Sequence, residues 1–390
     1  MNPANLPRNY IPETPPAPES FEISQPRPRS GCSIFHMSNP STSAAVRHIE
    51  HPGWTESHLS FFGGADGLAD ALARLPGGAT VVSADAFGTA EEIAAAGADC
   101  RAAGITAPLT RVLSTAAGFG GLELVAAAGC PVSRAGDECA GFVVEGPEAR
   151  HLFLGGIVPA DASATREAQT EAVFSRIGRA LDAVAMTFPD VARTWFYNDR
   201  ILDWYPGFNA VRTEYFRRHD IRRMPASTGI GAPNPDGFAL VAKALAVVPR
   251  RPGAATVHTV RSPLQCDAFA YGSAFSRAVV VGDSRTRTLH ISGTASISPG
   301  GESAHPGDTA AQIRLTMDVV REILREAAMD FSDTVRSVVY FRNPADIPLW
   351  SPRRFGLDAA PSAILGCDVC RDDLLFEIEL DAARPATAES

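Results

Sequence analysis

The chain has 390 residues, a net charge of −9 and 45% hydrophobic residues, which is typical of a globular protein with more than one structural unit. An acidic balance disfavours nucleic-acid partners, because neutralising phosphates requires a basic surface. The sequence has neither a run of 18 apolar residues nor an apolar secretory signal, and its seven cysteines, an odd number, do not predict a disulfide framework. We therefore expect a cytoplasmic protein with no membrane partner.

The first third of the chain carries few functional signals. Residues 1–30 contain eight prolines and cannot build a core, so we expect a flexible tail. Residues 31–135 are rich in Ala and Gly, with a strand expected at 79–83 and a helix at 89–103. We assign these residues to an N-terminal lobe over 31–250, whose recognisable core starts at about 140.

After residue 140 the chain repeats one series of elements at an offset of about 140 residues. The series is a strand ending at glycine, a helix, a second strand, a segment that starts with proline, and an alternating last strand. The first copy comprises residues 150–156, 167–181, 191–197, the segment from Pro225, and 237–247. The second comprises residues 287–293, 310–324, 335–341, the segment from Pro361, and 374–380. The repeat predicts an α+β fold of two tandem lobes, each a mixed sheet packed by helices, with the second lobe over 251–382 and a tail over 383–390.

The last strand carries the clearest chemical signal. Its even-numbered residues 374–380 are apolar and share one face, which leaves Glu377 and Glu379 on the other face. For Glu379 we expect a face exposed to solvent. Glu377 follows Cys370 by seven residues across a turn-like segment, and a carboxylic acid in an apolar pocket has a raised pKa and can act as a general acid near neutral pH.

Two further segments are candidates for a ligand pocket. Residues 195–212 combine six aromatic side chains with Asn and Arg, which suits a flat, charged ligand, although alone such a cluster is more typical of a core beneath a loop. Residues 225–231 (PASTGIG) are small enough for close approach to a ligand, or simply form a tight connection. Cys367 and Cys370 form a lone C-x-x-C that we interpret as packed cysteines, and no histidines have metal-ligand spacing, so we expect neither a metal nor a cofactor.

From about residue 140 to 382 these motifs, in this order, resemble the chorismatases, enzymes of the YjgF-type (chorismate-mutase-like) fold that cleave chorismate to pyruvate and a ring acid. The stretches that carry the resemblance are WFYNDRILDWY at 195–205 with FN at 208–209 and VR at 211–212, PASTGIG at 225–231, NP at 234–235, FSRA at 275–278, SGTASI at 292–297, GD at 307–308 with Gln312, and CDVCRDDLLFEIE at 367–379.

The resemblance implies roles for particular residues. The family's catalytic acid lies on the last strand and maps to Glu377, which would protonate the methylene carbon of the enolpyruvyl ether. Arginines would hold the two carboxylates of chorismate, because a bidentate pair supplies orientation as well as charge. In order of preference these are Arg342, Arg212 and Arg277. The remaining candidates for contacts to the substrate are Tyr197, Tyr205, Asn209, Thr228 and Gly293.

The resemblance leaves the product open. A cysteine seven residues before the acid marks the branch that forms 3-hydroxybenzoate, and Cys370 has this place. The alternative is hydrolysis to trans-3,4-dihydroxycyclohexa-1,5-diene-carboxylate. The loop at 298–305 is longer and the segment at 346–360 shorter than the family's pattern, and either could reshape the mouth of the pocket.

Two other functions remain to be weighed. The imine deaminases of the same fold use an arginine after a proline near the C-terminus, and this arginine is absent after both Pro225 and Pro361. A non-catalytic binding protein would gain nothing from Glu377, since burying a carboxylate near an anionic ligand is costly. A pocket lined by Glu377 and at least two arginines would favour the enzyme.

Because two fused lobes can complete a subunit interface internally, we expect a monomer.

Overall fold

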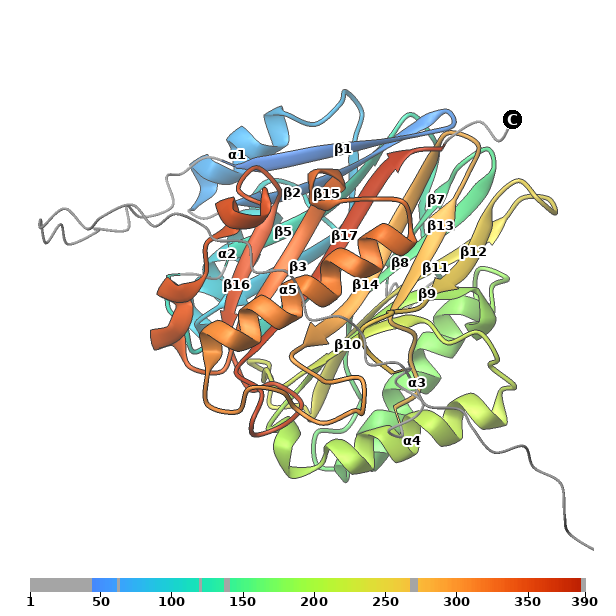
Figure 1. The fold of residues 1–390 in the computed structure, drawn as a ribbon. Helices are drawn as coiled ribbons and strands as arrows, with labels where there is room; N and C mark the ends of the chain where they lie inside the picture. The colour runs from blue at the N-terminus through green and yellow to red at the C-terminus, as the bar shows by residue number, and fades with distance from the viewer. Residues whose placement is uncertain (1–43, 62–63, 119–120, 137–140, 267–272, 387–390) are drawn as a thin grey trace, which may run out of the picture. The chain divides into compact units, whose positions relative to one another are not determined.

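The computed structural model describes residues 44–61, 64–118, 121–136, 141–266 and 273–386. The expected tail at 1–30 lies outside these residues. Residues Pro40–Ser390 form one compact unit, to which everything below refers. The fold is α+β, with three mixed sheets and helices packed on them (Figure 1). No helix among the described residues is both long and apolar enough to cross a membrane.

The expected elements of the repeat are confirmed, and each copy forms its own sheet. The strand order is β10-β9-β11-β8-β7-β6 in the second sheet and β12-β13-β14-β17-β15-β16 in the third. The elements of the second sheet are β6 (Val132–Arg134), β7 (Gly141–Glu145), β8 (Ala149–Ile157), α3 (Arg166–Asp182), β9 (Val191–Asn198), α4 (Tyr205–Arg218), β10 (Ala226–Ile230) and β11 (Leu240–Pro249). Those of the third are β12 (Thr256–Val260), β13 (Ala278–Gly282), β14 (Thr286–Ala295), α5 (Thr309–Glu326), β15 (Thr334–Phe341), β16 (Ser362–Gly366) and β17 (Phe376–Pro385), so residues 383–385 belong to a strand.

Residues 45–128 form a sheet with the same topology, which the sequence did not reveal. Its strand order is β1-β2-β5-β3-β4. In each sheet the last strand lies between the two strands that flank the first helix of the unit, namely β2 and β3, β8 and β9, or β14 and β15. The next strand of each unit, β4, β10 or β16, pairs in parallel with β3, β9 or β15. The elements of this first sheet are β1 (Ala45–His51), β2 (Trp54–Phe61), α1 (Ala65–Ala73), β3 (Thr80–Gly88), α2 (Ala90–Ala102), β4 (Leu109–Leu113) and β5 (Gly121–Ala128).

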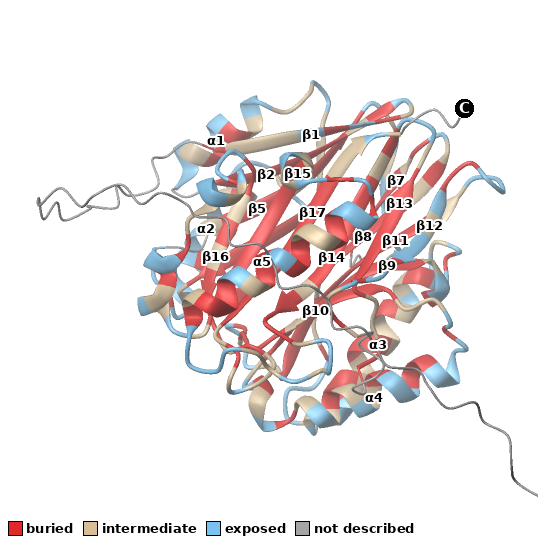
Figure 2. Ribbon diagram, viewed as in Figure 1, coloured by how far each residue is buried: buried red, intermediate tan, exposed pale blue. Residues whose placement is uncertain are grey.

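Each sheet has one face covered by its own helices and the other packed against the remaining sheets (Figure 2). The helices α3 and α5 each start at a side-chain cap: the side chain of Thr165 accepts from the Ala168 amide, and that of Asp308 from the Ala311 amide. A central core takes residues from all three sheets, among them Val82, Trp195 and Val338. The strands are therefore buried on both faces. Polar residues on the faces between the sheets are shielded from water and must form hydrogen bonds or ion pairs with one another.

Candidate active site

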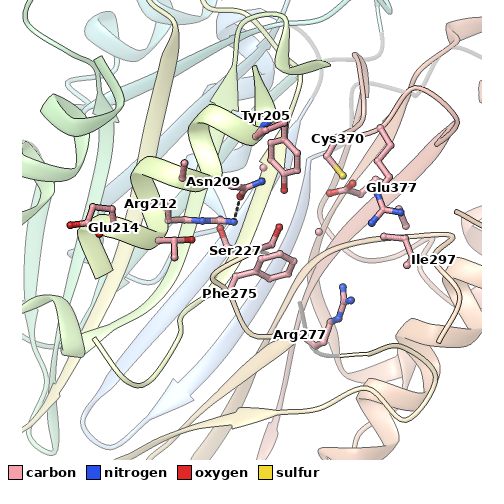
Figure 3. A pocket seen from close by; sticks show the side chains of 18 residues that line it. Tyr205, Asn209, Arg212, Glu214, Ser227, Phe275, Arg277, Ile297, Cys370 and Glu377 are labelled. Carbon is pink, nitrogen blue, oxygen red and sulfur yellow. Dashed lines mark hydrogen bonds between the residues drawn. The ribbon is translucent and has the colours of Figure 1, made fainter. Parts of the chain in front are cut away.

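A cavity of about 610 Å³ lies between the second and third sheets (Figure 3). Its walls come from α4, β10, the segment before β13, β14, the loop before β17 and the start of β17. The lining includes Tyr205, Asn209, Arg212, Glu214, Ser227, Phe275, Arg277, Gly293, Ile297, Cys370, Arg371 and Glu377. The segments that the sequence singled out separately, 195–212, 225–231 and 367–379, therefore meet at one place.

Glu377 is the first residue of β17 whose side chain reaches this cavity. β14 has a register shift between Ile291 and Thr294, and the intervening Gly293 lies against the Glu377 carboxylate. A Cβ atom on Gly293 would lie 2.0 Å from Glu377 Oε1, so only glycine leaves room for the carboxyl group. Among the described residues, the Glu377 carboxylate has no hydrogen-bond or ion-pair partner, and its side chain is buried.

This environment keeps Glu377 protonated at neutral pH. Burial, and then the negative charge of Glu379, raise its pKa from 4.5 to about 8, although Arg193 and Arg277 act in the opposite direction. A carboxylic acid with a pKa near the working pH is suited to donate a proton in a reaction.

Glu379 is not exposed, so the expectation of a solvated face for this residue is wrong. Its side chain has no exposed surface, and its carboxylate contacts Arg193 Nη2 at 3.0 Å, Trp195 Nε1 at 2.9 Å and Arg336 Nη2 at 2.7 Å. Burial alone would raise the pKa of Glu379, but Arg336 and Arg193 outweigh it and hold the pKa below its ordinary value. Glu379 is therefore a fixed negative charge two residues from the acid.

Three arginines line the cavity. Arg212 extends from α4 and donates from Nη2 to Asn209 Oδ1 at 2.6 Å. Arg277 donates to the carbonyl of Cys266. The Arg212 and Arg277 guanidinium carbons lie 5.6 Å and 5.7 Å from the centre of the Phe275 ring, so Phe275 lies between two cations. Three cations beside a protonated acid suit a ligand with more than one carboxylate.

Arg371 was not selected from the sequence, and Arg342, the first choice there, does not line the cavity. Arg342 Nε faces Asp368 Oδ1 at 3.6 Å. Arg371 donates to the carbonyl of Gly301, which fixes the 298–305 loop beside the cavity. The segment at 346–360 lies elsewhere, since Trp350 is buried against Phe376 in the helix-covered core of the third sheet.

The remaining candidates divide into cavity and core. Tyr205 and Asn209 line the cavity from α4. Tyr197 does not line it: its side chain is fully buried in the central core, and burial raises its pKa well above the ordinary value. Thr228 is also outside the lining, because its hydroxyl accepts from the Gly293 amide at 3.0 Å and from Arg193 at 2.6 Å.

Cys370 lines the cavity next to Glu377, whereas Cys367 is buried and does not line it. Burial, and then the charge of Glu377, raise the pKa of Cys370 to about 12, so it is a neutral thiol rather than a nucleophilic thiolate. Both cysteines have free thiols. No group of three or more His, Cys, Asp or Glu side chains within the described ranges is arranged to hold a metal ion.

The acid occurs in one of the three equivalent units. In each sheet the last strand pairs with an aromatic residue near the end of the third strand: Tyr340 opposite Glu377, Tyr197 opposite Val241, and Phe87 opposite Gly121. The equivalent positions of the first and second sheets therefore carry no carboxylate, and the proton-donating arrangement is particular to β17.

No family model and no curated protein matches the sequence. Among solved structures, a chorismatase crystal structure superimposes with a TM-score of 0.59 at 21% identity, over 78% of this chain and 93% of that chain. The fold is chorismatase-like. Single-unit proteins match about a third of the chain: the YjgF gene product of E. coli covers 32% of it at 23% identity (TM-score 0.27), and yeast Mmf1 covers 33% at 16% identity (TM-score 0.28).

Proposed function

We propose that this protein cleaves chorismate to pyruvate and a ring acid, with Glu377 as the general acid. The observation that carries the proposal is a buried, protonated Glu377 in a cavity lined by Arg212, Arg277 and Arg371. Chorismate carries two carboxylates and an enol ether, and these are the groups that three cations and one proton donor would serve. The fold shared with a chorismatase supports the same substrate.

The reaction begins with transfer of the Glu377 proton to the methylene carbon of the enolpyruvyl group. The carbon that bears the ether oxygen becomes an oxocarbenium-like centre, and the Glu377 carboxylate that remains is a negative charge beside it. The bond between the ring carbon and the ether oxygen then breaks, so that this oxygen becomes the carbonyl of pyruvate. Arg277 is one of the cations whose charge acts on Glu377, and we assign it to the pyruvyl carboxylate; Arg212, on α4, is left for the ring carboxylate.

We propose 3-hydroxybenzoate as the ring product. In this branch the neighbouring ring hydroxyl closes on the carbon that loses pyruvate and returns its proton to the Glu377 carboxylate. The epoxide-like intermediate then opens by breaking the bond between the oxygen and the carbon that first bore it. Loss of the ring proton from the carbon that keeps the oxygen, and protonation of this oxygen, give the aromatic acid. The two products together have the atoms of chorismate, so no water is consumed. A neutral Cys370 thiol beside Glu377 supports this branch, because it fills space that a nucleophilic water would need. Hydrolysis to the diene diol acid would instead consume one water.

The test is a coupled assay with purified protein and chorismate. Lactate dehydrogenase and NADH report pyruvate, and chromatography identifies the ring product. Pyruvate with 3-hydroxybenzoate is the expected result. Pyruvate with the diol would keep the enzyme and overturn the product. No pyruvate above the spontaneous background would refute the catalytic proposal and favour the binding protein, which calorimetry with chorismate would then examine.

A further inference from the structure

Glu379 occupies an unusual position for a residue with no part in the reaction. Its side chain and that of Arg193 are both fully buried. Together they form an ion pair that connects β17 of the third sheet to β9 of the second sheet. Burying two charges is costly, and an ion pair in such a place is weak evidence for stability alone. Glu379 is two residues from Glu377 on the same strand, and the charges of both Glu379 and Arg193 act on Glu377.

A chain of hydrogen bonds leads from this pair to the acid. Arg193 Nη2 donates to Glu379 Oε2 and also to the hydroxyl of Thr228. The Thr228 hydroxyl, itself hydrogen-bonded to Glu379, accepts from the amide of Gly293. Gly293 is the residue against which Glu377 Oε1 lies.

We propose that Glu379, Arg193 and Thr228 are positioning residues for Glu377: the network fixes the Gly293 backbone that confines the carboxyl group, and the charge of Glu379 keeps this group in its acid form. The proposal rests on the role of Glu377 as the proton donor and adds the device that prepares it. None of the three residues lines the cavity, so the network acts through Glu377 rather than on the substrate.

The direction of the electrostatic effect follows from the groups that face Glu377. Glu379 is on the same strand and disfavours a second negative charge, whereas Arg193 on β9 and Arg277 before β13 favour it. The loop before β17 supplies two thiols and Arg371, which lines the same cavity. Glu379 is thus the carboxylate whose charge opposes ionisation of Glu377, and its removal leaves the arginines to lower the pKa.

The experiment measures the ionisation of Glu377 directly and does not need turnover. Infrared difference spectra, titrated against pH, follow the carboxylic-acid carbonyl band that is lost in Glu377→Gln. In Glu379→Gln we expect the midpoint of this band to fall by on the order of one pH unit, since like charges about 7 Å apart interact by that amount at the effective dielectric of a protein. If the protein cleaves chorismate, the alkaline limb of its pH–rate profile moves by the same amount.

Glu123→Gln is the matched control. Glu123 has in β5 the place that Glu379 has in β17, is also buried, and accepts from Arg336 Nε at 2.7 Å, but it is not among the charges that act on Glu377. A purely structural role for the ionic core predicts similar losses of thermal stability in both variants and no change in the Glu377 band. An unmoved midpoint in folded Glu379→Gln would overturn the proposal even if the wild-type protein produces pyruvate.

Thr228 supplies a second, independent test should Glu379→Gln fail to fold. Thr228→Val keeps the shape of the side chain but leaves the Gly293 amide without its acceptor, and Thr228→Ser restores the hydroxyl. We expect the Glu377 band to shift or broaden in Thr228→Val and to recover in Thr228→Ser. Identical wild-type-like bands in both variants would refute the positioning role, whether or not chorismate is the substrate.

Discussion

Replacing Glu377 with glutamine removes the proton that the proposed reaction needs and keeps the size of the side chain. With a pKa of about 8, roughly nine-tenths of Glu377 side chains carry a proton at pH 7, against about one in 300 at the ordinary value of 4.5. The environment of the side chain thus increases the protonated fraction of Glu377 at pH 7 about 300-fold. Losing a general acid lowers the rate of a reaction on the order of 10²- to 10⁴-fold.

We therefore expect kcat of Glu377→Gln to fall by at least about 100-fold with little change in KM, since the arginines and not the acid hold the substrate. The same pKa predicts the pH dependence. The protonated form is active, so the wild-type rate is constant below about pH 8 and falls about tenfold for each pH unit above it.

The lactate dehydrogenase assay measures both quantities, and circular dichroism checks the fold of the variant. Glu214→Gln is the control, because Glu214 also borders the cavity but forms an exposed pair with Arg217 on its own helix. Turnover of Glu377→Gln close to that of the wild type, or a wild-type rate that rises between pH 8 and 10, would show that another group delivers the proton.

Three further predictions concern the cavity. Cys370→Ala should admit water and shift the product from 3-hydroxybenzoate toward the diol, whereas Cys367→Ala should not, because Cys367 does not line the cavity. An unchanged product ratio in Cys370→Ala would disprove the proposed role of the thiol. Arg277→Lys should raise KM for chorismate by about 10-fold or more through loss of a bidentate contact, and an unchanged KM would remove Arg277 from the carboxylate site. Gly293→Ala should abolish activity, because the added methyl group occupies the place of the Glu377 carboxyl group; crystals or thermal melts would show whether the fold survives, and full activity would show that the carboxyl group can bind elsewhere.

Local patterns in the sequence were sufficient for most elements of the repeat. Helical spacing located α3 and α5 to within two residues at each end, and alternation placed Glu377 opposite the apolar face of β17. The first sheet was not predicted as a further copy of the repeat. Its sequence His58-Leu59 followed by Gly63-Gly64 nevertheless resembles His151-Leu152 followed by Gly155-Gly156 in the second sheet. The strands of the first sheet mix polar and small residues on buried positions, as in β2 (WTESHLSF) and β3 (TVVSADAFG), and such a pattern gives weak contrast between the two faces of a strand.

What surrounds each polar residue was decided by the tertiary structure. A period of two shows that Glu377 and Glu379 share a face of β17, but not that other sheets cover this face, nor that Glu379 lies among Arg193 and Arg336 while Glu377 faces a cavity. Likewise, the sequence favoured Arg342 and did not single out Arg371, and only the path of the loop before β17 brings Arg371 to the cavity. The residue types and their strand positions follow from the sequence because these are local properties. Their pKa values and partners arise only when three sheets, distant in the chain, pack face to face and exclude water between them.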